Sequence, residues 1–471
     1  MKIERPMRSL ILAGAAVLAL GATAAQAVPV IPGGAGYGMD TPAGRGGTVY
    51  KVTNLNASGT GSLRACTDAT GKRVCVFEVA GYIRLTEDLL IRNGPITIAG
   101  QTAPSPGITI RGAGLKIHGS NILVQHIRVR PGDGLDGPDP ENRDALKLEG
   151  STSVPVTNVV IDHCTFSWAL DEVASIWGPH DNITFSNNIF SEPLNDSFHP
   201  TKDGTGHLEP HGFGVIIDTS ASGGRVTMVG NLIAHAEERN PLSRARELVF
   251  VNNMVYNRGA RDLDLQSQSS RTTKSTIEGN VFLQGPSNAA TTRPIYVRTT
   301  GSYTLYNGSK VYVHDTQAPD YGTSLSSWTV LTGGDLATAV LTTVSKPVWN
   351  TGLTARSTAS NAVYNSILTY SGARPTNRDN TDKRVIDSVR TRTGQIINCV
   401  SADGSTRCQK NARGWPTLTP TTRKLTLPAN PSTVASNGYT NLENWLHSMD
   451  ESLQGVTQST SPTAPAQLSV N

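Results

Sequence analysis

The sequence has almost no imbalance of charge. Its 471 residues carry 41 lysines and arginines against 37 aspartates and glutamates, a formal net charge of +4 at neutral pH. The first 27 residues contribute +2 of this, which leaves +2 for the rest of the chain. The sequence also lacks a long basic run and any RNA-binding signature, so a nucleic-acid partner is not expected. Attraction for an acidic ligand has to come from local clustering of charge.

The sequence has no apolar run long enough to cross a bilayer. The run from Leu10 to Ala22 is shorter than the roughly 20 residues that a membrane span needs, and no later segment is long enough. It follows three basic residues and precedes Ala25-Gln26-Ala27. This arrangement is typical of a secretory signal peptide over residues 1–27. We expect cleavage before Val28 and a soluble exported protein without a membrane anchor.

Cysteines are few, and no two CxxC-like pairs exist that would indicate a zinc site. Cys66 and Cys75 are nine residues apart, as are Cys399 and Cys408, and each pair flanks a turn that contains glycine. This spacing predicts two local disulfides in an oxidising compartment. Cys164 is left over and is expected to be a small buried side chain.

Short alternating apolar segments recur between Pro95 and Gln284, and several have an asparagine near the middle. In order they read NILVQHIRV, NVVIDHCTF, NITFSNNIF, RVTMVGNLI, ELVFVNNMV and STIEGNVFL. The shortest intervals between their central positions are 22 to 27 residues, and these positions are Ile127, Cys164, Asn188, Asn231, Asn253 and Asn280. Such a period favours a parallel β-helix with an internal asparagine ladder. An antiparallel sandwich is the alternative, but it would not explain the recurrent asparagine.

The repeats fade after about residue 300. We therefore predict an all-β fold, a right-handed parallel β-helix over residues 28–300, with a C-terminal extension containing short helices over residues 301–460. Helical patterns with capping residues lie at 357–375 and 377–394. Residues 461–471 have the composition of a disordered tail.

The most specific motif is ERNPLSRARELVFVNN at residues 238–253. Alone, an arginine-rich turn is most often a solvated surface turn. This segment, however, resembles the R-x-P-L-x-R segment of pectate lyases of polysaccharide lyase family 1, in which an Asn-Asn pair follows seven residues later. The matching residues are Arg239, Pro241, Leu242, Arg244, Asn252 and Asn253.

Three further segments support the same resemblance. GRGGTVYKVTNLNASGTGSLRAC is similar to the opening segment of the family, and VVIDHCTFSW is similar to its DH-C strand. NGYTNLENWLH resembles the ending of many secreted bacterial members. The resemblance covers most of residues 33–300 and scattered parts of the C-terminal region, and it implies the secreted bacterial type of pectate lyase.

The resemblance implies β-elimination on a galacturonan, with Arg239 as the base and Arg244 as a clamp on the substrate. A guanidinium group suits a carboxylate because its planar fork binds both oxygens. Arginine is a poor general base near neutral pH, because its reference pKa is about 12.5 or higher and the guanidinium group stays protonated. Neighbouring positive charge favours the neutral form, and an alkaline optimum is expected.

The resemblance also implies a Ca²⁺ cofactor, which requires several oxygen ligands. Asp144 and Asp171 match calcium aspartates of the family, and Asn142 stands where a second acid is common. Four residues beyond Asp171 the family commonly has another aspartate, whereas this chain has Ser175. We expect weak binding of Ca²⁺ until substrate carboxylates complete the shell; the alternative is that both aspartates only cap turns.

The loop HPTKDGTGHLEPHGFG contains further candidates for substrate binding, because the family places a lysine in the corresponding loop. Lys202 and His211 are the predicted substrate-binding residues, and His207 lies between them. Asp162 and His163 are interpreted as structural, because they lie within the strand repeat.

The leading prediction is a secreted, calcium-dependent pectate lyase that acts as a monomer on acidic plant cell-wall polysaccharide. A calcium-independent pectin lyase remains possible because of Ser175. A non-catalytic carbohydrate-binding β-helix protein would explain the repeats but not the arginine spacing. A glycoside hydrolase of the same fold would need clustered carboxylates, and no Asp-Asp pair occurs.

Overall fold

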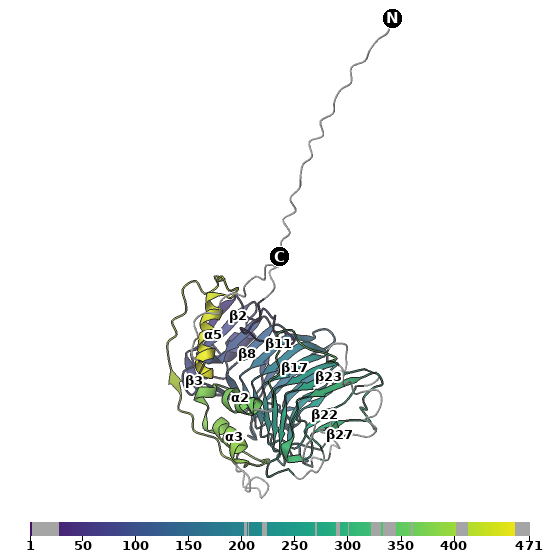
Figure 1. Ribbon diagram of the computed structural model, residues 1–471. Helices are drawn as coiled ribbons and strands as arrows, with labels where there is room; N and C mark the ends of the chain where they lie inside the picture. Colours follow the sequence, from purple (N-terminus) through teal and green to yellow (C-terminus); the bar gives the residue numbers. More distant parts are fainter. Residues whose placement is uncertain are drawn as a thin grey trace.

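Three parallel β-sheets form the body of the protein in a computed structural model (Figure 1). The structure describes residues 1 and 28–456, apart from residues 202–204, 206, 219–223, 269–270, 289–292, 300, 322–330, 333–344, 359–360 and 402–412. Successive strands along the chain pass from one sheet to the next and then return to the first. This is the parallel β-helix that the strand repeat predicts, and the parallel pairing rules out the antiparallel sandwich.

The strands are short because each coil of the helix turns three corners. Sheet one contains, in spatial order, β1 (Thr48–Val52), β2 (Arg73–Phe77), β5 (Ile96–Ala99), β8 (Ile122–Gln125), β11 (Val156–Asp162), β14 (His180–Ser186), β17 (Arg225–Val229), β20 (Glu247–Val251), β23 (Lys274–Glu278) and β26 (Lys310–His314). Sheet two contains β4 (Leu89–Ile91), β7 (Leu115–Ile117), β10 (Leu146–Glu149), β13 (Glu172–Trp177), β16 (Phe213–Ile217), β19 (Leu242–Ser243), β22 (Leu263–Leu265), β25 (Ile295–Val297) and β27 (Leu331–Thr332).

Sheet three closes each coil and ends in an antiparallel strand from the C-terminal region. Its strands are β3 (Val79–Arg84), β6 (Ile108–Arg111), β9 (Ile127–Arg130), β12 (Thr165–Ser167), β15 (Ile189–Ser191), β18 (Leu232–Ala234), β21 (Met254–Tyr256) and β24 (Val281–Leu283), with β28 (Thr421–Thr422) antiparallel to β3. Since β26 and β27 still pair in parallel with earlier coils, the coiled part continues beyond residue 300, where the sequence repeats become hard to recognise.

The asparagine ladder predicted from the sequence is present inside one corner of the coils. The side-chain amide of Asn188 donates to Asn231 Oδ1 at 3.0 Å, Asn231 donates to Asn253 at 2.9 Å, and Asn253 donates to Asn280 at 3.2 Å. Cys164 begins the row, and its backbone N–H donates to Asn188 Oδ1. All four amides are fully buried, and their partners replace the water that such groups would otherwise require.

The described cysteines follow the predicted pattern. Cys66 and Cys75 form a disulfide, and Cys164 is a buried free thiol. Cys399 is buried. Its predicted partner Cys408 lies outside the described residues, as do the signal-peptide segment 2–27 and the tail 461–471, so those expectations stay predictions.

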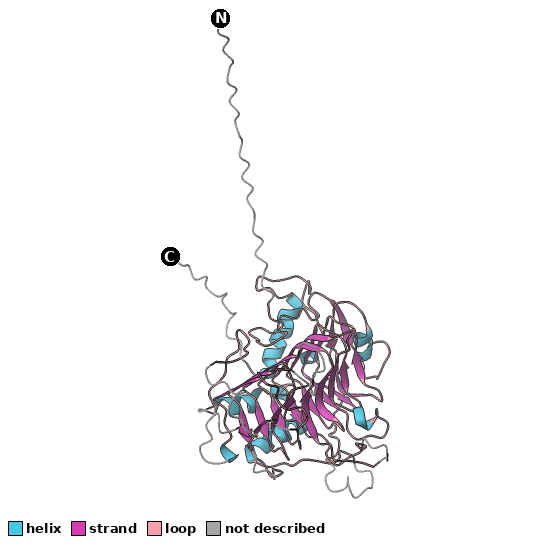
Figure 2. Cartoon of the chain, turned by 90° about the vertical axis from the view of Figure 1, so that its right-hand side faces the viewer, coloured by secondary structure: helices cyan, strands magenta, loops and turns pink. Residues whose placement is uncertain are grey.

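Helices lie on the outside of the coils (Figure 2). The α-helices are α1 (Leu63–Asp68), α2 (Ala362–Tyr370), α3 (Asn380–Thr391) and α5 (Asn441–Gln454), and the 3₁₀ helices are η1 (Gly100–Thr102), η2 (Pro140–Asn142), η3 (Pro319–Tyr321) and η4 (Pro375–Asn377). Helices α2 and α3 confirm the two helical patterns of the sequence. None of the described helices is long and apolar enough to cross a membrane.

Buried ion pairs fasten α3 to the coils. Arg130, on β9, donates to Asp379 at 2.6 Å and to Asp382 at 2.6 Å, and Arg128 Nε lies 3.0 Å from Asp382. Asp379 also caps the N-terminus of α3 by accepting from the Asp382 backbone N–H. Asp379 therefore caps the helix and, together with Asp382, neutralises two arginines that the sheet buries.

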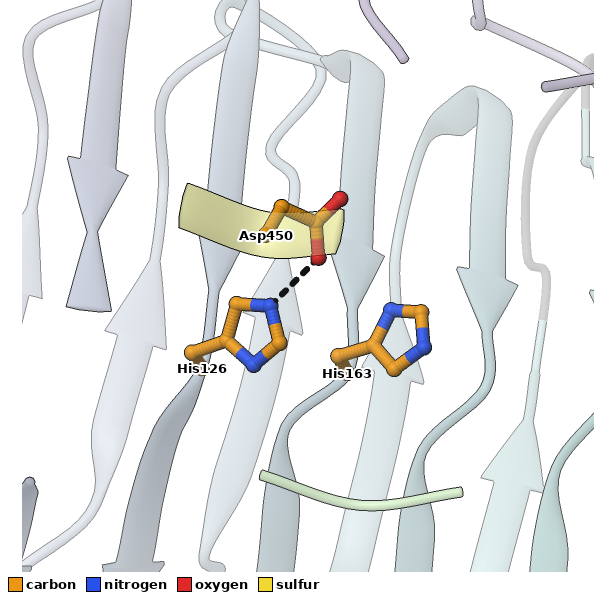
Figure 3. Close-up of side chains that lie close together, drawn as sticks. All are labelled: His126, His163 and Asp450. Carbon is orange, nitrogen blue, oxygen red and sulfur yellow. Dashed lines mark hydrogen bonds and ion pairs between the residues drawn. The ribbon is translucent and has the colours of Figure 1, made fainter. Parts of the chain in front are cut away.

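A second buried contact fastens α5 (Figure 3). His126 Nε2 lies 2.6 Å from Asp450 Oδ1, and His126 Nδ1 accepts from the backbone N–H of Arg374 at 3.1 Å. The ring of His163 stacks beside His126, with 5.2 Å between centroids, and its Nδ1 lies 2.8 Å from Asp162. Asp162 and His163 thus belong to a buried network in the coil, which agrees with their structural interpretation.

Candidate functional site

The candidate residues gather where sheet two presents the ends of its strands. Because the sheet is parallel and in register, residues just before neighbouring strands share one edge, and residues just after them share the other. Asp144 precedes β10, Asp171 precedes β13, His211 precedes β16 and Arg239 precedes β19. Arg244 directly follows β19. Separate parts of the sequence are brought together in this way by one regular element.

Three carboxylates form the centre of this site. Asp144, Asp171 and Glu172 each offer an oxygen, and the three oxygens lie within 4.8 Å of one another. Asp144 is 2% exposed, and its Oδ1 has no hydrogen-bond partner, whereas its Oδ2 accepts from Ser175 Oγ. Burial and the charge of Asp171 raise the pKa of Asp144 to about 8, although Lys147 and the Ser175 hydrogen bond act in the opposite direction. Such a group favours either a proton or a cation beside it.

The departure at Ser175 has a direct structural counterpart. Ser175 lies opposite Lys147 in the register of β10 and β13, and its hydroxyl donates a hydrogen bond to one carboxylate oxygen of Asp144. Asn142 lies at the end of η2, where its Oδ1 accepts from Lys147 Nζ at 3.4 Å. The Asn142 side chain thus contacts a lysine in the structure, and its part in metal binding stays a prediction.

Arg239 is largely buried beside the carboxylates. Its side chain is 22% exposed, its Nη1 contacts Glu172, and its guanidinium lies 4.1 Å from the centre of the Phe213 ring. Burial lowers the pKa of Arg239 to about 10; the charge of Arg244 lowers it too, whereas Asp171 acts to raise it. The Glu172 carboxylate also opposes the decrease, because an opposite charge stabilises the guanidinium.

The backbone at Arg239 is unusual as well. Its φ of 59° lies in the left-handed region, which a non-glycine residue seldom adopts. The backbone C=O of Arg239 accepts from Val215 N–H at 2.5 Å, and the N–H of Asn240 donates to Asp262 at 3.1 Å. These bonds on both sides fix the direction in which the Arg239 side chain leaves the sheet.

Arg244 is held on three sides. Its Nη1 lies 3.0 Å from Asp218 Oδ2, and its Nε donates to Gln266 Oε1 at 2.9 Å. Its guanidinium carbon lies 3.7 Å from the centre of the Tyr303 ring, and Tyr303 is 43% exposed. A guanidinium fixed in this way is oriented before any ligand arrives.

The loop that precedes β16 contributes two histidines. His211 Nε2 lies 2.9 Å from Asp171 Oδ1, so the structure brings His211 to the carboxylates. His199 stacks on His211 with 3.6 Å between ring centres. His207 is exposed, and Lys202 lies outside the described residues, so the role predicted for Lys202 stays a prediction.

Several residues of the site were not singled out from the sequence. They are Glu172, His199, Asp218, Gln266 and Tyr303. Glu172 directly follows Asp171, a predicted calcium ligand, and this position next to Asp171 is the one feature of the sequence that could have indicated Glu172. Asp218 and Gln266 follow strands of sheet two at the position equivalent to Arg244, which only the register reveals.

Comparison with known proteins gives relatives of one kind. The chain is 36% identical over 276 residues to a probable pectate lyase C of Neosartorya fischeri. The aligned segment covers 58% of this chain and 59% of the relative. It is 31% identical over 315 residues to a probable pectate lyase C of Aspergillus flavus, which covers 66% of this chain and 68% of the relative. Pectate lyase 5 of Ambrosia artemisiifolia is 28% identical over 174 residues. No protein-family profile matches the chain.

Among solved structures, the chain overlaps in part with the major allergen from cedar pollen, with a TM-score of 0.47 and 18% identity over 72% of this chain and 92% of that chain. It also overlaps with a double variant of pectate lyase from Xanthomonas campestris, with a TM-score of 0.45 and 13% identity over 74% of this chain and all of that chain. With respect to the curated relatives, the aligned part of the chain spans less than two thirds of the length of several, such as the one from Neosartorya fischeri, and slightly more than two thirds of others, such as the one from Aspergillus flavus.

Proposed function

The chain belongs to the pectate lyase family, and from this membership we propose that it cleaves polygalacturonate by calcium-dependent β-elimination. The observation that carries the proposal is the position of Arg239, which is largely buried beside a carboxylate cluster and close to a second, fixed arginine. Neither a binding protein nor a hydrolase would require a buried arginine with a lowered pKa at this place.

Arg239 acts as the base in the proposed reaction. In its neutral form it takes the proton from C5 of a galacturonate residue. The electron pair of the C5–H bond forms the C4–C5 double bond, and the bond from C4 to the glycosidic oxygen breaks. The leaving oxygen takes a proton from solvent, and an unsaturated uronate end remains.

Arg244 binds the substrate carboxylate in this proposal. Its contacts with Asp218 and Gln266 leave part of its fork of donors for a ligand. A carboxylate clasped by a guanidinium carries less negative charge, so the neighbouring C5 proton becomes more acidic. Arg244 thus stabilises the charge that develops when Arg239 removes the proton.

The carboxylate cluster suits a hard cation. Asp144 Oδ1 is buried without a hydrogen-bond partner, and carboxylate oxygens are the ligands that Ca²⁺ prefers. We propose that Asp144 and Asp171 hold Ca²⁺, with Asn142 as a weaker candidate. When bound, the ion would supply positive charge that neutralises the substrate carboxylate. Glu172 is already engaged with Arg239, so substrate carboxylates are expected to complete the shell.

Export and the monomeric state remain part of the proposal. The signal-peptide pattern of residues 1–27 and the Cys66–Cys75 disulfide support export to an oxidising compartment. The assignment to the secreted bacterial type stays a prediction, since the curated relatives come from fungi and a plant. An N-terminus at Val28 in the exported protein, found by mass spectrometry, would support the first point.

The test follows absorbance of the unsaturated product on polygalacturonate, with calcium and then with a chelator. Product that forms with calcium and disappears with the chelator supports a pectate lyase. Product on methylated pectin that survives the chelator would instead support a pectin lyase, which the Ser175 hydroxyl on Asp144 favours as the second candidate. Binding of polygalacturonate without any product would support a non-catalytic protein.

A further inference from the structure

A pair of histidines borders the carboxylate cluster on the side of the loop before β16. Three groups of described residues could each place three ligand atoms around an ion. One of them is Asp171 with His199 and His211, and this group contains imidazole nitrogens, which hard cations seldom use. We propose that these three residues form a second metal site, selective for a divalent transition metal such as Zn²⁺ or Co²⁺.

The distances suit one shared ion. Asp171 Oδ1 lies 2.9 Å from His211 Nε2 and 3.8 Å from His199 Nε2. Bonds of roughly 2.1 Å to zinc allow two ligand atoms to be at most about 4.2 Å apart. Both separations fall below this limit.

A second carboxylate lies behind the histidines. Glu209 Oε1 is 3.5 Å from His199 Nδ1 and 3.7 Å from His211 Nδ1. Metal-binding histidines commonly donate their other ring N–H to a carboxylate, which fixes the tautomer that points a lone pair at the metal. Glu209 faces the Nδ1 atoms of both histidines, and Asp171 faces their Nε2 atoms. The imidazole rings therefore lie between the Glu209 carboxylate on one side and the proposed metal site on the other.

The buried polar atoms also indicate an absent partner. His211 is 6% exposed, yet its Nε2, which faces the proposed ion, has no hydrogen-bond partner that meets normal geometry. In His199, which is 1% exposed, the unpaired ring nitrogen is Nδ1, on the side of Glu209. An unpaired buried nitrogen costs about 1–3 kcal/mol. The loop backbone holds the donors in place, since Glu209 N–H donates to His199 O at 2.9 Å and His211 N–H donates to Asn195 O at 2.7 Å.

One feature of the pair has to change on binding. The two rings are parallel within 4°, and lone pairs in parallel planes do not converge on one point. A bound ion therefore requires the rings to splay by rotation about their side-chain bonds. The centre of the His211 ring lies 4.0 Å from that of Phe213, and the Arg239 guanidinium also packs on Phe213, so metal binding should also alter the surroundings of the proposed base.

The other histidine group, His126, His163 and Asp450, is less suited to bind a metal (Figure 3). His126 Nδ1 accepts from a backbone N–H, so its proton lies on Nε2 and points at Asp450. A ring nitrogen that carries a proton has no lone pair for a metal. This group therefore serves as a contrast to the site at Asp171.

The inference goes beyond the proposed lyase activity, and its test measures metal binding alone. The full exported chain, without an affinity tag, is titrated with Co²⁺ while its visible absorbance and bound metal are measured. We expect one equivalent with a spectrum of nitrogen ligation. His199→Gln and His211→Gln should each weaken binding at least tenfold, and Glu209→Gln should weaken it by about tenfold or more.

His207→Gln is the matched control, because His207 is exposed in the same loop. It should bind Co²⁺ as the unaltered protein does, and far-ultraviolet circular dichroism should show that every variant is folded. Failure of the unaltered protein to bind one equivalent, or unchanged binding in folded His199→Gln and His211→Gln variants, would overturn the proposal. Either result leaves the chelator test of lyase activity unaffected.

Discussion

Arg239 combines burial, a left-handed backbone and contact with both a carboxylate and an aromatic ring. Each feature acts on the guanidinium in a different way: the backbone sets its direction, Phe213 packs against it, and burial makes its charge less favourable. The free energy that keeps an arginine charged in water is thereby reduced, and the residue approaches the behaviour of a weak base.

Arg239→Lys is expected to lower turnover on polygalacturonate by at least about 100-fold, because lysine is shorter and lacks the planar fork. The thermal unfolding temperature should change little, since lysine keeps a positive charge beside the buried Glu172. Turnover is measured from the initial rate of product absorbance with calcium. Near-normal turnover in a folded variant would remove Arg239 from the mechanism.

The unaltered enzyme should show the titration of the same group. The active form is the neutral one, and the pKa of Arg239 is about 10, so activity should rise about tenfold per pH unit below that value and level off above it. A profile with its maximum near neutral pH would contradict an arginine base. Stability is measured at each pH so that unfolding is not mistaken for titration.

Arg244→Lys should chiefly raise KM. A lysine at this position can keep the charge, but it cannot contact Asp218 and Gln266 and also grip a carboxylate with two parallel bonds. A lost hydrogen bond to a charged group corresponds to roughly a tenfold increase in KM. If kcat falls by that factor while KM is unchanged, Arg244 acts in the transition state alone.

The carboxylates and the amide of the proposed calcium site should differ in importance. Asp171→Ala is expected to raise the calcium concentration for half-maximal activity by more than Asn142→Ala, because Asn142 contacts Lys147 and contributes no charge. The measurement is a calcium titration of activity for both variants. Equal effects would place Asn142 among the ligands as a full partner.

At the scale of elements, the asparagine ladder makes each coil depend on its neighbours. The Asn231 side chain accepts from the Asn188 backbone N–H and donates to the Phe185 backbone C=O, so its removal takes these hydrogen bonds from two buried backbone groups. Asn231→Ala should therefore lower the free energy of unfolding by about 2–4 kcal/mol in a denaturant titration. Asn56→Ala, at an exposed asparagine, is the control and should change it by less than about 0.5 kcal/mol. An equally small change for Asn231→Ala would show that the ladder is not required.

The elements that could be predicted from the sequence are those with a period. Asn188, Asn231 and Asn253 recur at intervals of one coil, and helix α3 carries its own capping residue, Asp379. The site was predicted in part, because Arg239 and Arg244 lie in one short motif. Asp218 and Tyr303 were not predicted, since only the sheet register and the coil path bring them to Arg244. Likewise β26 and β27 follow long insertions that hide the repeat.

At the scale of the whole molecule, a buried contact ties the C-terminal helix to the coils. Burial opposes ionisation of Asp450, but the hydrogen bond from His126 holds the pKa of Asp450 below its usual value. A carboxyl with a lowered pKa contributes stability above the unfolded value of about 3.9, and this contribution is lost as pH falls through the folded value.

Asp450→Asn should accordingly lower the free energy of unfolding at pH 7 by about 1.5–3 kcal/mol. The deficit relative to the unaltered protein should stay constant down to about pH 4 and shrink below it. Denaturant titrations at pH 7 and pH 3 measure both values. Asp387→Asn, in an exposed pair with Arg390, is the control and should have little effect at either pH. A deficit that grows on acidification would contradict the assigned direction.

The docking of α5 also sets the order in which the protein can be completed. Leu442 and Leu446 of α5 pack in one apolar cluster with Val74, Val76 and Ala99 on the first coils, and Asp450 reaches a histidine 324 residues earlier in the chain. A ribosome makes those first coils well before α5. The nascent chain therefore carries an uncovered apolar patch on its first coils until α5 has been synthesised.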